Sequence, residues 1–225
     1  MAKNMQVMIE APVEICTSTK PTASVIWLHG LGADGHDFAP VIDMLNLPHI
    51  RFILPHAPVQ KISQYQGHEM RAWYDLFGLN SNSPQDAAGI QQSQQTIEAL
   101  IANEHARGIA ANRMVIAGFS QGGAMALHTA LRHQNSLAGV LALSTYLPLQ
   151  ATLAIEKTAA NQVTPIFMAH GNFDEVITLE RAKASLHALQ TEYYQVDWRE
   201  YPMAHSVCEQ EISDIAQFLA LTLPQ

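Results

Sequence analysis

Gly118-Phe119-Ser120-Gln121-Gly122-Gly123 is the stretch of sequence that decides the fold. It matches the pattern G-x-S-x-G. An apolar segment at 113–117 precedes it, and residues 124–131 after it have the composition of a helix. A glycine-flanked serine between a strand and a helix forms a sharp turn that presents the hydroxyl at the top of a sheet. Glycine tolerates the strained backbone of such a turn and lets the strand and the helix pack closely.

The G-x-S-x-G pattern is moderate evidence when it stands alone. Because glycine and serine are common residues, roughly one chain in ten of this length contains it by chance. It becomes strong evidence only where the rest of the chain supplies a base, an acid and hydrogen-bond donors for an oxyanion.

Length and composition favour one domain, which we expect to cover residues 1–225. The chain is 48% hydrophobic and 14% charged, so it has enough apolar side chains for a sizeable core. Its formal net charge is -8, with only 12 lysines and arginines. This acidic balance argues against binding to nucleic acid and against attraction to an anionic membrane surface.

The sequence contains no segment that predicts export or membrane insertion. Residues 1–6 include a lysine, but no apolar region long enough for a signal peptide follows them. No apolar run reaches the length of a membrane span. The two cysteines, Cys16 and Cys208, lie far apart, and we expect reduced thiols, with a single bridge as the alternative. We therefore expect a cytoplasmic protein without stable membrane insertion.

Short apolar runs alternate with helical stretches, which predicts an α/β domain with a mostly parallel sheet. Near-continuous apolar runs are typical of parallel strands covered on both faces, and sites in such sheets lie beyond the carboxyl ends of the strands. For the longest helix, Ser83 is the expected N-cap, Pro84 the first residue and Gly108 the stop. The expected strands are 25–28, 51–54, 114–117, 139–143, 165–169 and 196–201, and the expected helices are 84–107, 121–133, 179–193 and 206–221.

A glycine-rich turn, His29-Gly30-Leu31-Gly32-Ala33-Asp34-Gly35, directly follows the first buried strand. An enzyme that transfers acyl groups needs two N–H donors aimed at the developing oxyanion. In the hydrolase arrangement one donor is the residue after the nucleophile, here Gln121, and the other lies in an early strand–helix loop, here Leu31. An ordinary glycine-rich turn is the alternative, and the G-x-S-x-G motif favours the donor loop.

A candidate acid and a candidate base follow the serine in the chain. Asp174 comes just past the expected strand 165–169, with Glu175 as its nearest rival and a plain surface turn as the alternative. His205 lies on the loop after the last expected strand. The order Ser120, Asp174, His205 is that of a serine hydrolase triad. Position decides among the 11 histidines: His105, His128, His133 and His187 lie on expected helices, His170 has the wrong order, and His29 is expected to support the loop that it starts.

Five blocks of sequence are informative as a set: 28–35 (LHGLGADG), 70–75 (MRAWYD), 118–123 (GFSQGG), 144–148 (STYLP) and 203–206 (MAHS). Together they resemble the bacterial carboxylesterase / acyl-protein thioesterase family of serine hydrolases. The blocks spread over essentially the whole chain, and their combination is far more specific than any one motif. A looser block at 170–176 resembles the family's H-G-x-x-D-x-V, with Asn172 and Phe173 in place of smaller or acidic residues, which affects the expected pocket shape.

The resemblance implies an α/β-hydrolase fold, with a mostly parallel central sheet flanked by helices on both faces and no large lid. No cofactor or metal is expected, because the histidines show no H-E-x-x-H or comparable spacing. For Trp73, core filling is the alternative to a pocket role. The implied residues are Ser120, Asp174 and His205 for the triad, Leu31 and Gln121 for the oxyanion donors, and Trp73, Tyr146 and Val176 for the substrate pocket.

The expected function is that of a serine carboxylesterase acting on short- to medium-chain carboxylic esters through an acyl-enzyme. Acyl thioesters of lipidated proteins are a further expected substrate, and the expected state is a monomer or homodimer. The alternatives are a lysophospholipase, an amidase or peptidase on the same fold, and a catalytically silent ligand-binding module. A cysteine nucleophile is disfavoured because the G-x-S-x-G turn carries serine. Fold and triad do not choose the physiological substrate.

Overall fold

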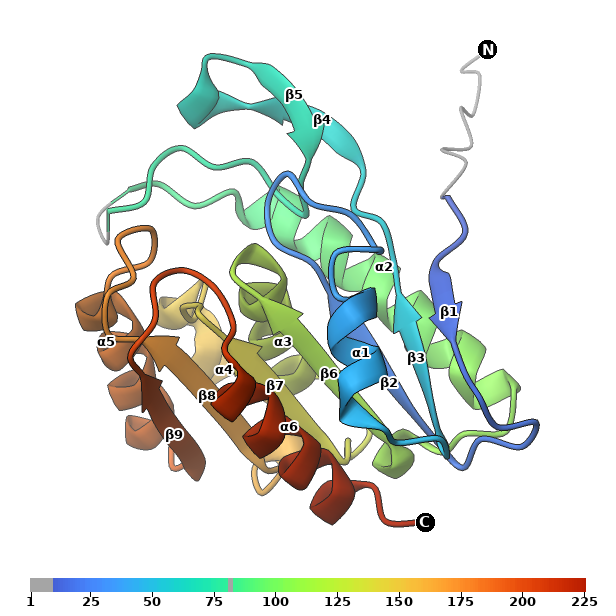
Figure 1. Cartoon of the computed structure of the whole chain (residues 1–225). Helices are drawn as coiled ribbons and strands as arrows, with labels where there is room; N and C mark the ends of the chain where they lie inside the picture. The colour runs from blue at the N-terminus through green and yellow to red at the C-terminus, as the bar shows by residue number, and fades with distance from the viewer. Residues whose placement is uncertain (1–9, 81–82) are drawn as a thin grey trace.

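A central sheet of seven strands organises the fold. The structure is a computed structural model, and it describes residues 10–80 and 83–225. Strand β1 lies antiparallel to β3 at one edge, and the other neighbouring pairs are parallel (Figure 1). Residues 1–6, which carry the expectation of no signal peptide, fall outside the described residues. In sheet order the strands are β1 (Val13–Ile15), β3 (Ile50–Leu54), β2 (Ala23–Leu28), β6 (Met114–Phe119), β7 (Gly139–Leu143), β8 (Ile166–Gly171) and β9 (Val196–Tyr201).

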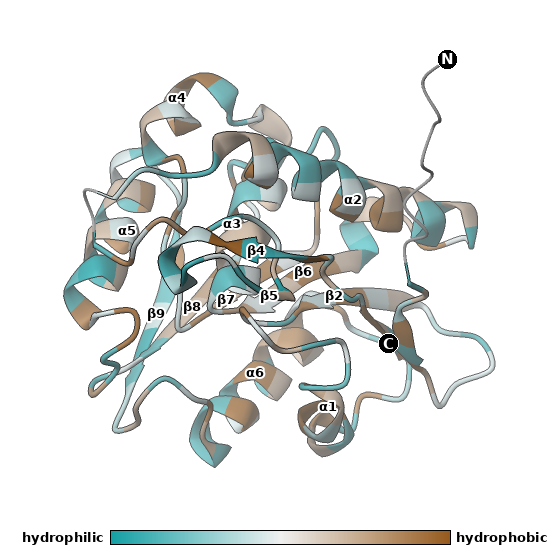
Figure 2. Ribbon diagram, turned by 90° about the horizontal axis from the view of Figure 1, so that it is seen from above, coloured by the Kyte–Doolittle hydropathy of each residue, from teal (hydrophilic) through white to brown (hydrophobic). Residues whose placement is uncertain are grey.

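Helices cover both faces of the sheet, as Figure 2 shows from above. On one face α2 (Ala87–Ala106), α3 (Gln121–Arg132) and α5 (Leu179–Thr191) contribute to one core cluster. On the other face α1 (Ala39–Leu45) and α6 (Glu209–Thr222) contribute to a second. Every residue of β2, β3, β7 and β8 is buried, because strands between two layers of helices have no face toward water. The predicted α/β architecture is therefore confirmed.

The start of the longest helix differs from the prediction. Asp86, and not Ser83, is its N-cap, since the Asp86 carboxylate accepts the backbone N–H of Gly89 at 2.9 Å. The other carboxylate oxygen accepts the N–H of Asp75 at 2.9 Å, and a β-bridge joins Gln85 to Leu76. These contacts hold the residues before Asp86 against the preceding loop, so the helix begins at Ala87.

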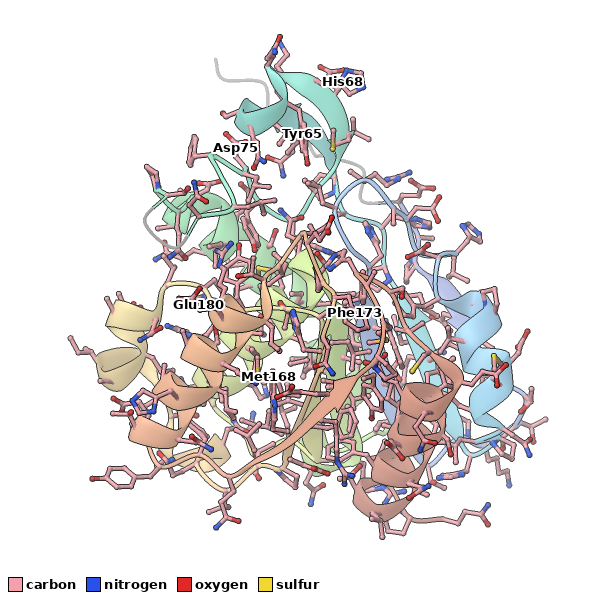
Figure 3. All side chains as sticks on the ribbon, turned by 60° about the vertical axis from the view of Figure 1, so that its left-hand side comes forward. Tyr65, His68, Asp75, Met168, Phe173 and Glu180 are labelled. Atoms are coloured by element: carbon pink, nitrogen blue, oxygen red, sulfur yellow. The ribbon has the colours of Figure 1, made fainter. Side chains whose placement is uncertain are left out.

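A small hairpin was absent from the sequence prediction. Strands β4 (Val59–Ile62) and β5 (His68–Arg71) pair antiparallel and lie beyond the carboxyl ends of the parallel strands (Figure 1). Only one of their eight residues is buried, and they give no apolar run that could have predicted them. Figure 3 shows Tyr65 and His68 on this hairpin, above Phe173 in the loop after β8. The hairpin is short, and the turn between its strands contributes Tyr65 to the cavity described below.

The remaining expectations on organisation concern cysteines and membranes. Cys16 is exposed, Cys208 is half-buried, and both are free thiols, so the single bridge does not form. Within residues 10–80 and 83–225, no helix is both long and apolar enough to cross a membrane.

The turn between β6 and α3 leaves no room for side chains beside the serine. A Cβ built on Gly122 would lie 2.2 Å from the carbonyl oxygen of Leu28, and one on Gly118 would lie 2.3 Å from the Gly122 backbone. Ser120 itself has a φ of 53°, in the region that side chains rarely adopt. The glycines therefore permit the strained serine by letting β2, β6 and α3 approach one another.

We predict that Gly122→Ala costs about 3 kcal/mol or more of unfolding free energy, because the backbone of β2 or α3 must move to admit a methyl group. Gly67→Ala is the matched control. Gly67 has a φ of +79° but no atom within 4 Å of a built Cβ. Alanine there should therefore introduce backbone strain alone and lower the unfolding free energy by about 1–2 kcal/mol. Urea unfolding of both variants measures the difference, and equal costs would contradict the packing argument.

Candidate active site

Ser120 lies at the junction of β6 and α3, where two hydrogen bonds connect its strained backbone to β7 and the loop after it, besides the helical bond from the N–H of Ala124. Its N–H donates to the carbonyl of Leu143 at 2.9 Å, and its carbonyl accepts the hydroxyl of Thr145 at 2.6 Å. Both partners belong to the end of β7 and the loop after it. The serine is 9% exposed, so its hydroxyl lies at a nearly closed surface.

His205 joins the serine to an acidic residue. Its Nε2 lies 2.9 Å from Ser120 Oγ, and its Nδ1 lies 2.7 Å from Asp174 Oδ2. Because an ionised carboxylate only accepts hydrogen bonds, Nδ1 carries a proton and Nε2 is left with a lone pair toward the serine hydroxyl. The ring of Phe119 packs on the imidazole, with 4.8 Å between centroids. The structure thus brings together the three residues that the sequence proposed as a triad.

Asp174 is held in its ionised form by hydrogen bonds on both oxygens. Its Oδ1 accepts the backbone N–H groups of Val176 and Ile177, each at 2.9 Å. Burial tends to raise the pKa of Asp174, but the hydrogen bond from His205 and the two N–H groups outweigh it and lower that pKa. The rival acid, Glu175, is exposed and has no hydrogen bond to the residues that the structure describes.

His170 is part of this arrangement, although its position in the chain had set it aside. It is fully buried at the end of β8, with Nε2 at 2.7 Å from the carbonyl of Ile177 and 3.4 Å from Asp174 Oδ2. Burial lowers the pKa of His170, so the ring is neutral, and the carbonyl acceptor requires the proton on Nε2. The only sequence signal for this contact was the shared block with Asp174.

Two residues that line the cavity with Ser120 have backbone N–H groups without an acceptor in the described part of the chain. Leu31 and Gln121 both line the same cavity as Ser120, and Gln121 is the first residue of α3. Among residues 10–80 and 83–225, no group accepts a hydrogen bond from either N–H. The side chain of Gln121 has a separate task, because it accepts the N–H of Trp73 and donates to the carbonyl of Tyr74, each at 2.8 Å.

The cavity above Ser120 has a volume of about 290 Å³. Of the predicted pocket residues, Tyr146 and Val176 line it, and Leu31 does too. Its lining is Gly30, Leu31, Ala33, Asp37, Tyr65, Tyr74, Leu76, Leu79, Phe119, Ser120, Gln121, Tyr146, Val176, Ile177 and His205. Neither Asn172 nor Phe173 belongs to it, and Phe173 is 66% exposed at the surface (Figure 3).

The pocket prediction for Trp73 was wrong. Trp73 is 2% exposed and is absent from the cavity lining. Its indole N–H donates to the carbonyl of His29 at 2.9 Å, and its backbone carbonyl accepts the hydroxyl of Ser93. These contacts hold the Trp73 side chain in the core, and the adjacent Tyr74 lines the cavity instead.

One group of side chains could be considered for a metal ion. Asp34, His36 and His56 have ligand atoms within 4.8 Å of one another in the described part of the chain. However, His56 Nδ1 accepts the N–H of Gly35 at 3.1 Å, so the neutral ring carries its proton on Nε2. That nitrogen therefore has no lone pair for a cation, and the cluster is better explained by its own hydrogen bonds.

A family model described as phospholipase/carboxylesterase matches residues 10–223. The chain belongs to this family. Acyl-protein thioesterase 1 of Neurospora crassa is 39% identical over 226 residues, which cover 95% of this chain and 92% of that protein. Its counterpart in Mycosarcoma maydis is 37% identical and covers 92% and 94%. The crystal structure of Zea mays acyl-protein thioesterase 2 has a TM-score of 0.86 at 26% identity and covers 94% and 98%.

Membership of the phospholipase/carboxylesterase family makes this chain a carboxylic ester hydrolase with an α/β-hydrolase fold. The resemblance seen in the sequence is confirmed, although it named bacterial members and these three relatives come from fungi and a plant.

We predict that the protein is less stable toward unfolding at acidic pH, and that His29 causes part of this loss. His29 is the first residue of the loop that contains Leu31. Burial lowers the pKa of His29 from 6.5 to about 4. The neutral ring accepts the N–H of Ala57 on Nε2 at 3.0 Å, which a second ring proton would prevent. Between pH 6.5 and 4 the unfolded chain therefore binds more protons than the folded chain. As the pH is lowered through this range, the unfolding free energy decreases by up to about 3 kcal/mol.

Urea unfolding at pH 7 and at pH 4.5 measures this loss, with His29→Gln as the comparison. The variant should lose less stability between the two pH values than the wild type. It should keep part of the loss, since burial also lowers the pKa of His128 to about 4. An identical loss in both proteins would show that His29 is not responsible.

Proposed function

We propose that Ser120, His205 and Asp174 carry out the ester hydrolysis of this family member, and that the substrates are esters and acyl thioesters of short to medium chains. The single observation that supports this most is the pair of contacts at His205, 2.9 Å to Ser120 Oγ and 2.7 Å to Asp174 Oδ2. In this geometry the base reaches the nucleophile and the acid fixes the tautomer of the base.

The proposed reaction has two halves with one base. His205 Nε2 takes the proton of Ser120 as Oγ attacks the acyl carbonyl, and the same proton then goes to the departing alcohol or thiol. Water attacks the acyl-enzyme with His205 again as base, which releases the acid and restores the serine. Asp174 remains ionised and stabilises the imidazolium in both halves, in keeping with its lowered pKa.

The backbone N–H groups of Leu31 and Gln121 are the proposed oxyanion donors. Both line the cavity with Ser120, and neither has an acceptor among the residues that the structure describes. An N–H at the first position of α3 also benefits from the positive end of the helix dipole. Loss of one such donor typically lowers the rate by about 100–1,000-fold.

The cavity volume suggests the length of the proposed acyl group, and the named relatives suggest the proposed leaving group. A volume of about 290 Å³ is at the lower end for a small-molecule pocket, which favours short and medium chains. Because the named relatives are acyl-protein thioesterases, lipidated proteins are among the proposed substrates. Two free thiols agree with a reducing, cytoplasmic location, and a monomer or homodimer remains the proposed state.

We predict that Ser120→Ala abolishes hydrolysis of p-nitrophenyl butyrate, since in the described part of the chain no other hydroxyl bonds His205 Nε2. Circular dichroism checks that the variant is folded, and a fluorophosphonate probe should label the wild type and not the variant. Retained hydrolysis would contradict the proposed nucleophile. A wild type that is neither labelled nor active would favour the silent binding module.

Parallel assays with a thioester, a lysophospholipid and an amide separate the proposed substrates from the lysophospholipase and amidase alternatives. Turnover of ester and thioester with little turnover of the other two is the expected result. A higher kcat/KM for the amide or the lysophospholipid would replace the proposal with the matching alternative.

A further prediction concerns His170 as a positioning residue. His170→Phe keeps a ring against Trp198, whose ring centroid lies 6.3 Å away, but removes the N–H that bonds the Ile177 carbonyl and faces Asp174. We expect kcat to fall about tenfold, which corresponds to about 1.4 kcal/mol, with a smaller change in KM. His170→Gln, which restores an N–H donor, should recover part of kcat. Equal losses in both variants would indicate packing alone.

A further inference from the structure

Two tyrosines of the cavity wall share a hydrogen bond that leaves one hydroxyl proton unused. Tyr74 and Tyr146 both line the cavity, and their hydroxyl oxygens lie 2.8 Å apart. Within the described ranges, 10–80 and 83–225, neither hydroxyl has another polar partner. Two hydroxyls hold two protons, and a single bond between them uses only one of these.

Either hydroxyl of this pair can be the donor. Tyr74 is 2% exposed and Tyr146 is 5% exposed, and a buried donor without an acceptor is costly. The bond direction in which Tyr74 donates to the oxygen of Tyr146 leaves the free proton on the less buried residue. In that direction the proton of Tyr146 is available to a ligand.

A positive charge lies directly against the ring of Tyr146. The guanidinium carbon of Arg181, on α5, is 3.5 Å from the ring centroid, and Arg181 Nη1 donates to the carbonyl of Leu79 at 2.6 Å. No carboxylate of the described chain forms an ion pair with Arg181. At the position beside the two hydroxyls, the charge favours a ligand oxygen, which offers a lone pair, over a ligand methylene group.

Tyr146 is also linked to the reacting serine through its neighbour in the chain. It follows Thr145, whose hydroxyl donates to the carbonyl of Ser120, so this hydrogen bond connects the loop of Tyr146 to the turn of Ser120. An acyl chain attached to Ser120 has to share this cavity with the Tyr146 hydroxyl.

We propose that the hydroxyl of Tyr146 binds an oxygen atom on the acyl chain, so that the preferred substrates are esters or thioesters of short acids that carry a keto, hydroxy or carboxy group. The proposal rests on the proposed function of Ser120, because it assumes that the acyl chain occupies this cavity. A polar group placed in an apolar pocket discriminates well against an analogue that lacks the matching oxygen.

The test compares p-nitrophenyl hexanoate with its 4-oxo and 5-oxo derivatives. Because an oxo group also changes the intrinsic reactivity of the ester, the deciding quantity is the ratio of kcat/KM, oxo ester over hexanoate, in two proteins. Tyr146→Phe removes only the hydroxyl and should lower this ratio roughly 3- to 10-fold for at least one oxo ester. Each ratio is measured within one preparation, so partial unfolding of a variant does not affect it.

Tyr193→Phe is the matched control, since Tyr193 is 84% exposed and lies outside the cavity lining. It should keep the wild-type ratio. An unchanged ratio in Tyr146→Phe for both oxo esters would overturn the proposal while leaving the proposed function intact. Failure of the wild type to hydrolyse hexanoate, or hydrolysis that survives Ser120→Ala, would overturn the proposed function itself and this proposal with it.

Discussion

The close approach of Gly122 to the carbonyl of Leu28 is the constraint on which the rest of the structure depends. It brings the first turn of α3 against the end of β2, at a distance that no side chain at position 122 would allow. The turn after β6 and the loop after β2 therefore lie side by side, and Leu31 and Gln121 line one cavity with Ser120. The strained φ of Ser120 is the local consequence of this packing.

A second constraint couples the acid to the cavity wall. Asp174 is held by the N–H groups of Val176 and Ile177, and these two residues also line the cavity. His170 fixes the carbonyl of Ile177 from the buried end of β8. The orientation of the carboxylate and the shape of the pocket are thus set by the same short turn, and a change in one is expected to alter the other.

Burial simplifies the electrostatics around His205. The pKa values of His29 and His170 are lowered by burial, so both rings are neutral and serve as hydrogen-bond partners of the backbone. Asp174 keeps its charge because its hydrogen bonds outweigh its burial. A charged carboxylate among neutral rings is an environment suited to the imidazolium that His205 forms in the proposed reaction.

The sequence by itself determined the elements and the order of the site. Apolar runs predicted the parallel strands, because the hydrophobic pattern of an element is local. Glycines predicted the turn at Ser120. The positions just after the carboxyl ends of later strands predicted Asp174 and His205. Only the tertiary structure decided which of Trp73 and Tyr74 faces the cavity, that Asp86 caps the longest helix, and that the β4–β5 hairpin brings Tyr65 to the cavity. It also decided the contacts of His170 with Ile177 and of Arg181 with Tyr146. Such choices depend on hydrogen bonds and packing between segments, which no local pattern of the chain encodes.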